Sequence, residues 1–295
     1  MTAPEVNDVT LGVVQFACSD NAGENLATAS RLVREAAGRG ANVVLVQELF
    51  EGLYFCQEQA AVHFARARPL DDAHPTLGVM RALAAELGVV IPVSLFERRN
   101  QAYYNSVVMV DDEGRTLGVY RKSHIPDGPG YEEKFYFNPG DTGFRVWPTR
   151  FGTIGVGICW DQWFPEAARA MALAGAEFLL YPTAIGSERG RPDFDSMEHW
   201  RITMRGHAGA NLMPVAAANR IGTEQVGGYE QTYYGSSFIA GPTGALVASA
   251  ERTGEAVLTA TFDRAQMRAD RAAWGLFRDR RPELYGALAT ADGGA

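Results

Sequence analysis

The chain has 295 residues, of which 46% are hydrophobic and 21% charged, as in a globular protein that buries a substantial core. Its formal net charge of -8 at pH 7 argues against nucleic-acid binding, which needs clustered Lys and Arg, and favours a cationic over an anionic small molecule. No apolar run approaches the ~20 residues that span a bilayer. Residues 1–9 lack the basic and apolar pattern of a secretion signal, so we expect a cytoplasmic protein.

Three cysteines are present: Cys18, Cys56 and Cys159. Three cysteines in a chain of this length do not make a disulfide framework. We expect them to be reduced thiols, which agrees with a cytoplasmic location.

The first third of the chain alternates apolar strands with amphipathic helices. In chain order, the pattern predicts a strand at 9–16, a helix at 24–40, a strand at 41–48, a helix at 75–88 and a strand at 89–97. Pro75 is a typical first residue of a helix, and Gly40 and Gly88 are typical of helix ends. Strands that alternate with helices favour an α/β fold whose sheets are covered by helices.

The remaining two thirds continue this mixture. The pattern predicts strand pairs within 103–122 and 144–159, a helix at 165–177, strands at 178–184 and 212–219, a helix at 196–211, a hairpin at 236–250 and a last strand at 255–263. No linker rich in Pro, Gly or Ser interrupts the chain, so we expect one domain over residues 1–295 with its core at about 9–262. The tail at 263–295 lacks a core pattern and is expected to fray or to pack on a partner subunit.

Three predicted strands end on a reactive side chain: Glu48, Lys122 and Cys159. In α/β folds, functional sites gather beyond the carboxyl ends of strands. Each residue alone has an ordinary explanation, since a cysteine at a strand end is usually a small hydrophobic residue. Together, at equivalent strand ends, the three favour a catalytic site.

These three groups suit nucleophilic catalysis by a thiol. A carboxylate in a poorly hydrated pocket can accept the proton of Cys159. A lysine at the same site can stabilise the oxyanion that forms when the thiolate attacks a carbonyl or nitrile carbon. The backbone N–H of Trp160, just after the cysteine and close to a helix start, is a candidate second donor to this oxyanion.

The blocks "QELF", "GVYRKSHIP" and "GVGICWDQWFPEA" resemble those of the nitrilase superfamily of carbon–nitrogen hydrolases. The likeness extends from about Leu11 to Phe262. It implies a four-layer αββα sandwich in which Glu48 is the general base, Lys122 stabilises the oxyanion and Cys159 is the nucleophile. It also implies a second glutamate beside the lysine, which we assign to Glu133 because the family's Glu-Lys pair aligns with Glu133-Lys134.

Within this superfamily, "QELFEGLYFCQ", "RKSHIPDGPGYEEKFYFNPGDTGF" and "GHAGANLMPVAAANRIG" resemble the branch that hydrolyses N-carbamoylputrescine. This resemblance implies an amidohydrolase that yields putrescine, carbon dioxide and ammonia through a covalent intermediate on Cys159, in polyamine biosynthesis. It implies neither a metal nor another cofactor. It also implies a homodimer or higher homo-oligomer, with partner contacts in the C-terminal tail.

The substrate is expected to be a small cationic carbamoyl amine. Members of the superfamily that hydrolyse carbamoyl amino acids carry an arginine just after the nucleophile, whereas here the first arginine after Cys159 is Arg169. A terminal ammonium would need a carboxylate, for which Glu188 is the first candidate and Asp127 the second. Two aromatic residues, Tyr54 and Trp163, are candidates for walls along the methylene chain, although core or interface packing explains them equally well.

Other functions stay open at this stage. The same chemistry would serve another N-carbamoyl amine or amino acid, such as N-carbamoyl-β-alanine, or a simple amide or nitrile. A non-catalytic binding or assembly module is a minor alternative, because all three reactive residues are present. A metal site is not expected, since His199 and His207 lie farther apart than the two histidines of a His-Glu-x-x-His motif and the five histidines are scattered.

Overall fold

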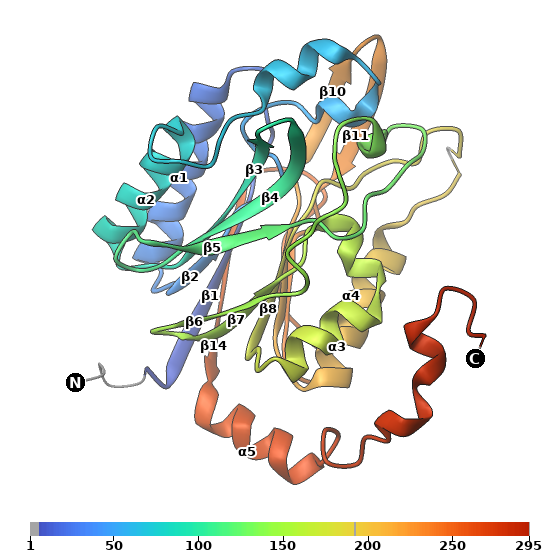
Figure 1. The fold of residues 1–295 in the computed structure, drawn as a ribbon. Coiled ribbons are helices and arrows are strands. Elements are labelled where there is room, and N and C mark those ends of the chain that lie inside the picture. Colours follow the sequence, from blue (N-terminus) through green and yellow to red (C-terminus); the bar gives the residue numbers. More distant parts are fainter. Residues whose placement is uncertain (1–5, 192, 295) are drawn as a thin grey trace.

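The structure is a computed structural model that describes residues 6–191 and 193–294. Two β-sheets face each other at its centre, and a pair of helices covers the outer face of each (Figure 1). The first sheet has the strand order β14–β1–β2 and continues through backbone bonds of Val44 and Asn42 with Val90 into β3–β4–β5. Its strands are β1 (Asp8–Gln15), β2 (Val43–Leu45), β3 (Ile91–Arg99), β4 (Ala102–Val110), β5 (Thr116–Arg121) and β14 (Ala256–Asp263).

The second sheet has the strand order β13–β12–β9–β8–β7–β6. Its strands are β6 (Val146–Thr149), β7 (Gly152–Val156), β8 (Phe178–Pro182), β9 (Val215–Ala218), β12 (Phe238–Ala240) and β13 (Leu246–Ser249). Strands β7, β8 and β9 are parallel, so their carboxyl ends lie at one edge of this sheet.

The helices complete the expected four-layer αββα sandwich. On the first sheet lie α1 (Ala22–Gly38) and α2 (Pro75–Leu87), and on the second lie α3 (Pro165–Leu173) and α4 (Met197–Asn211) (Figure 1). The side chain of Asn21 caps α1 by accepting bonds from the N–H groups of Gly23 and Glu24. Helix α2 begins at Pro75 and ends at Gly88, whose φ of 65° is the left-handed conformation that favours glycine. Within the described residues, no helix has both the length and the apolar composition that crossing a bilayer requires.

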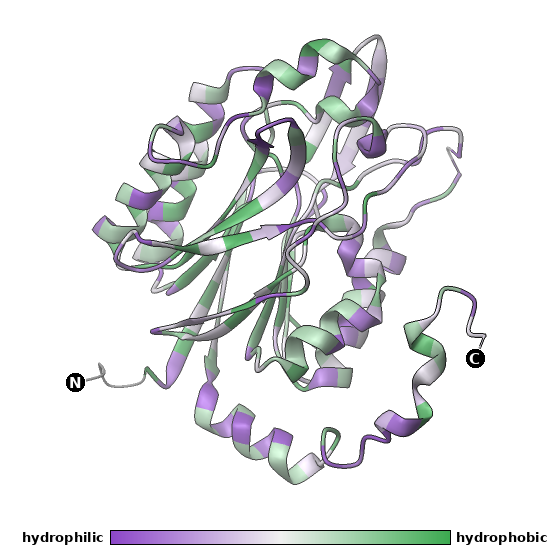
Figure 2. Cartoon of the chain, viewed as in Figure 1, coloured by the Kyte–Doolittle hydropathy of each residue, from purple (hydrophilic) through white to green (hydrophobic). Residues whose placement is uncertain are grey.

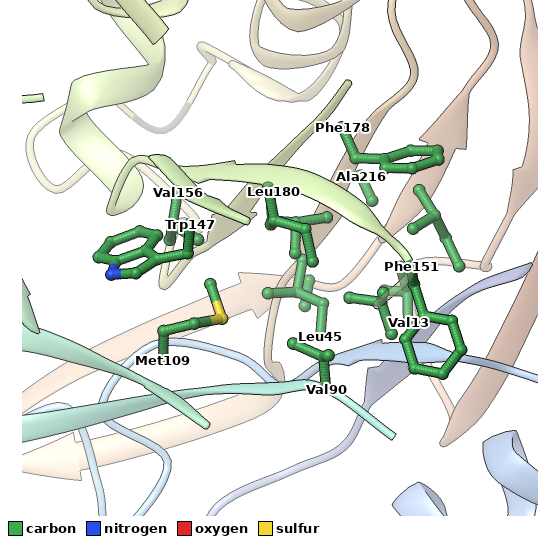
Figure 3. Close-up of a cluster of buried hydrophobic side chains, with 14 of the residues drawn as sticks. Val13, Leu45, Val90, Met109, Trp147, Phe151, Val156, Phe178, Leu180 and Ala216 are labelled. Carbon is green, nitrogen blue, oxygen red and sulfur yellow. The ribbon is translucent and has the colours of Figure 1, made fainter. Parts of the chain in front are cut away.

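The main core lies between the two sheets. Side chains from β1, β2, β4, β7, β8 and β9 meet there with Trp147 and Phe151 (Figure 3). Figure 2 shows the central strands as largely hydrophobic, whereas α5 (Arg264–Trp274) alternates hydrophilic and hydrophobic residues. Because the sheets are held by this buried surface, the loops at their edges can carry polar groups without opening the core.

The two strands that were expected to end on Glu48 and Cys159 end earlier, and the difference bears on the site. Strand β2 ends at Leu45 rather than at Glu48, and β7 ends at Val156 rather than at Cys159. Cys159 instead begins a short 3-10 helix, η4 (Cys159–Trp163). The reactive residues therefore lie in the loops just beyond the strands, and only Lys122 directly follows its strand.

The hairpin of β10 (Ile221–Val226) and β11 (Tyr229–Tyr234) is not among the predicted elements. Its strands are rich in Thr, Glu and Gln, and several of these side chains are exposed, so the apolar alternation that predicts strands is weak. Its two-residue turn, Gly227-Gly228, has positive φ at both positions, as such hairpins require.

The C-terminal segment is more regular than predicted. It begins with α5, capped by the Asp263 side chain, which accepts a bond from the N–H of Gln266. Only Arg264 and Met267 of this helix are buried. Contacts of this segment with a partner subunit stay a prediction.

We expect Leu180→Ala to destabilise the fold by about 2–5 kcal/mol, because Leu180 is 1% exposed between the two sheets and its loss leaves a cavity. The control is Leu117→Ala on β5, where the side chain is 37% exposed and a loss of about 0.5 kcal/mol is expected. Urea unfolding of both variants measures the difference, and equal losses would contradict the assignment of Leu180 to the core.

Candidate active site

A single ammonium group joins two buried carboxylates at the centre of the candidate site. Lys122 Nζ donates to Glu48 Oε1 over 3.0 Å and to both oxygens of Glu133, over 2.8 Å and 2.7 Å. All three side chains are completely inaccessible to solvent. They come from three segments: the loop after β2, the residue after β5, and η3 (Glu133–Phe135).

The two carboxylates keep the lysine charged. Burial opposes a positive charge, but the charges of Glu133 and Glu48 hold the pKa of Lys122 well above its usual value. Burial raises the pKa of Glu133, Lys122 lowers it and Glu48 raises it again, with a net upward shift. Removing a charge from water costs free energy, and here the attraction between the lysine and the two carboxylates offsets that cost. Each of the three charged groups therefore needs the others in order to stay buried.

Two neutral side chains support the carboxylates from behind. The hydroxyl of Tyr54 donates to Glu133 Oε1 over 2.5 Å, and Asn105 Nδ2 donates to Glu48 Oε1 over 2.7 Å. Glu48 Oε2 is buried and has no hydrogen-bond partner among the described residues. One oxygen of Glu48 is thus fixed by Lys122 and Asn105, and the other is available to a reacting group.

Cys159 stands at the sharp turn between β7 and η4. Its φ of 43° lies in the left-handed region, which is strained for a residue with a side chain. The thiol is oriented toward the carbonyl of Ala184, 3.9 Å from Sγ. Burial raises the pKa of this thiol well above its usual value, Glu48 raises it further and Lys122 opposes the shift. The resting thiol is therefore protonated at neutral pH and needs a base to react.

Asp161 holds this turn in place. Its buried carboxylate accepts bonds from the N–H of Ile158 and the hydroxyl of Tyr120, at 2.9 Å and 2.7 Å. It also accepts the backbone N–H of His124 over 3.0 Å and contacts its ring Nδ1 at 2.7 Å. One side chain thus ties the nucleophile's turn to the segment that follows Lys122.

A pocket of about 450 Å³ opens onto Cys159. Its lining is largely aromatic and apolar, with charged groups from the loop between β8 and α4. The lining residues are Pro126, Asp127, Gly128, Pro129, Tyr131, Cys159, Trp160, Trp163, Ile185, Glu188, Arg189, Arg191, Phe194, Ser196 and His199. The volume lies in the range of small-molecule pockets, and Cys159 is the only thiol among the described lining residues.

The predicted site residues fall into two groups. Glu48, Lys122 and Glu133 lie together, near enough to Cys159 for their charges to shift the pKa of its thiol, whereas Asp127, Trp163 and Glu188 line the pocket with Cys159 and Trp160. Of the two candidate anchors for an ammonium, Glu188 is half-buried and Asp127 is exposed. Burial raises the pKa of Glu188, although a hydrogen bond from Ser196 and the charge of Arg191 lower it.

The structure does not place Tyr54 on the pocket wall. Its ring is completely buried and its hydroxyl binds Glu133, so it supports the catalytic cluster instead of contacting a ligand. The sequence around Tyr54 does not indicate this hydrogen bond, because its acceptor, Glu133, lies 79 residues away.

Sequence reasoning also missed two arginines. Arg189 and Arg191 line the pocket from the loop after β8, far from the position after the nucleophile where an arginine was sought. The Arg189 guanidinium lies 4.1 Å from the Tyr229 ring and donates to the carbonyl of Gln57. The Arg191 guanidinium lies 4.3 Å from the Phe194 ring. The pocket therefore carries charges of both signs.

The two histidines on α4 have separate surroundings. His207 Nε2 lies 2.7 Å from the carbonyl oxygen of Gln162, and the His199 ring packs on Trp163 with their centroids 4.7 Å apart. Across residues 6–191 and 193–294, no group of three or more His, Cys, Asp or Glu side chains is arranged to hold a metal ion.

Comparison with known proteins agrees with this geometry. Residues 10–272 match the carbon–nitrogen hydrolase family. The chain belongs to this family. A carbon–nitrogen hydrolase from Helicobacter pylori G27 has the same fold, with a TM-score of 0.89 at 38% identity over 96% of this chain and 99% of that one.

Two curated relatives of this carbon–nitrogen hydrolase have named activities. N-carbamoylputrescine amidase of Arabidopsis thaliana is 60% identical over 97% of both chains. Citrullinase of Francisella tularensis is 52% identical over 94% of this chain and 97% of the relative. The two names refer to different substrates.

We expect Lys122→Met to cost about 3–5 kcal/mol of stability at about pH 8, because it leaves two carboxylates buried without a cation. Without the lysine, burial and mutual repulsion raise the carboxylate pKa values in the folded state. The folded state then binds more protons than the unfolded chain, so stability rises as pH falls. Part of the loss should therefore be recovered at about pH 5.

Unfolding of Lys122→Met and of the exposed control Lys134→Met at both pH values measures this effect. The control is expected within about 0.5 kcal/mol of the unaltered protein. A Lys122→Met protein with the same loss at both pH values would show that the carboxylates do not carry this charge balance.

Proposed function

We propose that this carbon–nitrogen hydrolase converts N-carbamoylputrescine into putrescine, carbon dioxide and ammonia. The observation that carries the proposal is the buried Lys122, held by Glu48 and Glu133, whose charges act on Cys159 in the wall of a pocket that Glu188 also lines. The 60% identity to a plant N-carbamoylputrescine amidase over nearly the whole chain supports the choice of substrate.

In the first half of the reaction, Glu48 takes the proton of Cys159, and the sulfur attacks the ureido carbon. The C=O π electrons move to the oxygen, which becomes an oxyanion in a tetrahedral species. When the carbonyl re-forms, the bond between the ureido carbon and its unsubstituted nitrogen breaks. Glu48 returns the proton to this nitrogen, which leaves as ammonia. An S-carbamoyl group, a thiocarbamate, is left on Cys159.

Lys122 supplies the main stabilisation of the oxyanion. An ammonium has three N–H groups. We assign one to Glu48 and a second, bifurcated, to the two oxygens of Glu133, which leaves the third for the substrate oxygen. The N–H of Trp160 is assigned as the second donor, because Trp160 follows the strained Cys159 and lines the pocket. Glu133 holds Lys122 in register throughout.

In the second half, Glu48 removes a proton from water, which attacks the thiocarbamate carbon. The C–S bond breaks and the thiol is re-formed with the proton held by Glu48. The product, a carbamic acid of putrescine, decomposes to carbon dioxide and the free amine. Glu48 acts twice, as a base and then as an acid, which agrees with its one unpaired buried oxygen.

The pocket in front of Cys159 suits a short chain that ends in an ammonium. Glu188 is assigned to the distal amine, with Asp127 as the alternative carboxylate, and both line the pocket. The faces of Trp163 and Tyr131 border the same space and can cover the methylene groups. A half-buried carboxylate binds an ammonium more strongly than an exposed one, which favours Glu188 over Asp127.

A ureido amino acid such as citrulline is the second candidate. The specific observation in its favour is the pair Arg189 and Arg191 on the pocket wall, since a guanidinium can bind an α-carboxylate beside an α-amino group. The similarity to a citrullinase points the same way. Both candidates place the same ureido carbon at Cys159 and differ only at the far end of the ligand.

The proposal predicts ammonia release from N-carbamoylputrescine at a kcat/KM at least about tenfold above that for citrulline or N-carbamoyl-β-alanine, a difference of about 1.4 kcal/mol. Cys159→Ala should lose activity on all three, because no other group can form the covalent intermediate. An ammonia assay at equal substrate concentrations gives the order. A preference for citrulline would keep the mechanism and move the assignment to the second candidate.

Glu188→Gln should raise KM for N-carbamoylputrescine about tenfold or more while leaving kcat within a factor of about three, because it removes the charge that binds the distal ammonium. N-butylurea, which has the same ureido group and no ammonium, should be hydrolysed equally by both proteins. Asp127→Asn is the matched carboxylate control. If it alone raised KM for the cationic substrate, the ammonium site would belong to Asp127.

A further inference from the structure

We propose that Arg220 is a positioning residue that holds the general base Glu48 in its reactive orientation. Arg220 lies between β9 and β10 and does not line the pocket, and its side chain is completely buried. The inference rests on the proposed function, in which Glu48 acts as a base, and assigns to the β10–β11 hairpin a part in the same reaction.

The guanidinium of Arg220 binds the backbone on both sides of the turn after Glu48. Its Nη2 donates to the carbonyl of Glu48 over 2.7 Å and to that of Leu49 over 3.2 Å. Its Nη1 donates to the carbonyl of Gly52 over 3.2 Å. One planar side chain thus fixes three carbonyl groups within five residues of chain.

This turn needs such support. Leu49 has a φ of 47°, a left-handed conformation that is unfavourable for a branched side chain. It persists only where the surroundings hold it. Since Leu49 follows Glu48 directly, relaxation of its backbone would shift the Glu48 carboxylate from the position in which it bonds Lys122 and Asn105. The N–H of Leu49 donates to the hydroxyl of Ser94 over 3.0 Å. In the peptide that joins Glu48 to Leu49, both the carbonyl and the N–H are therefore hydrogen-bonded.

A buried glutamate extends the same support to the end of the loop. Glu224, on β10, accepts a bond from Arg220 Nη1 over 2.7 Å through Oε1. Its other oxygen accepts the N–H of Tyr54 over 2.6 Å. Because the hydroxyl of Tyr54 binds Glu133, the Arg220–Glu224 pair reaches both carboxylates that flank Lys122.

The charges of the pair explain why it is stable in the interior. Burial opposes the positive charge on Arg220, but Glu224 raises its pKa above the usual value, so the guanidinium stays charged. A lysine at this position could still pair with Glu224. It could not bind the carbonyls of Glu48, Leu49 and Gly52 together, because an ammonium lacks the planar fork of donors.

Arg220→Lys tests the proposal, with Arg264→Lys as its matched control. Arg264 is also buried, and it likewise joins a carboxylate to a backbone carbonyl, bonding to Glu177 over 2.7 Å and to the carbonyl of Val6 over 2.8 Å at the start of α5. We expect Arg220→Lys to lower kcat for N-carbamoylputrescine about 10- to 100-fold with KM within about threefold. Arg264→Lys should keep both constants within about twofold.

Hydrogen exchange supplies a measurement that does not depend on activity. Peptides covering residues 48–54 should exchange about tenfold faster in Arg220→Lys, because the N–H groups of Glu48, Leu49 and Tyr54 lose the support of their bonds. Arg264→Lys should leave these peptides unchanged. Unchanged exchange at 48–54 in Arg220→Lys, or a kcat within threefold of the unaltered protein, would overturn the role of Arg220. An unaltered protein that hydrolyses neither candidate substrate would overturn the proposed function instead, and exchange alone would then decide whether Arg220 holds the loop.

Discussion

The site depends on one buried ammonium shared by two carboxylates. Without Lys122, the negative charges of Glu48 and Glu133 could not stay in the interior. Without the two carboxylates, burial would favour the neutral form of the lysine or its movement into solvent. The ion cluster therefore requires three distant segments to converge: the loop after β2, the end of β5 and η3. The sandwich makes this possible, because its two sheets bury enough apolar surface to hold their edges still while the loops carry charge.

Convergence alone does not orient the reacting atoms, and the chain uses backbone strain for that purpose. Leu49 and Cys159 both adopt left-handed conformations, one beside the base and one at the nucleophile. Each turn is held by a buried charged side chain: Arg220, from a distant segment, holds the first, and Asp161, which lies in η4 and also bonds the distant Tyr120, holds the second. The strain is thus balanced by hydrogen bonds that form only when the whole fold is in place.

The strand and helix pattern predicted an α/β fold, and the family resemblance implied its four layers. The strand ends also predicted that Glu48, Lys122 and Cys159 lie close together, although two of the strands end before the residues named. The prediction survived because a loop that leaves a strand carries its first side chains over the same sheet edge. Contacts between residues distant in the sequence could not be predicted in this way. Tyr54 is predicted to line the pocket, and no feature of the residues around it indicates its hydrogen bond to Glu133. Arg220 and Glu224 lie in a stretch with weak apolar alternation. The hydrophobic pattern of this stretch therefore predicts neither its strand nor the burial of these two side chains.

The placement of charge also separates the chemistry from the choice of substrate. The groups that activate sulfur are completely buried, whereas Glu188, Arg189 and Arg191 lie together on the loop between β8 and α4. No hydrogen bond that the structure describes joins these three side chains to the side chains of Glu48, Lys122 and Glu133. The loop does meet the cluster at one backbone bond, from the N–H of Glu48 to the carbonyl of Thr183 over 3.4 Å. Changes at the three charged side chains can therefore alter the pocket while the buried ion pairs stay in place. Relatives 60% and 52% identical to this chain bear names that refer to different substrates. In the proposed reaction, the two candidate substrates share the attack at the ureido carbon and differ at the far end of the ligand, so these three charged side chains would decide between them.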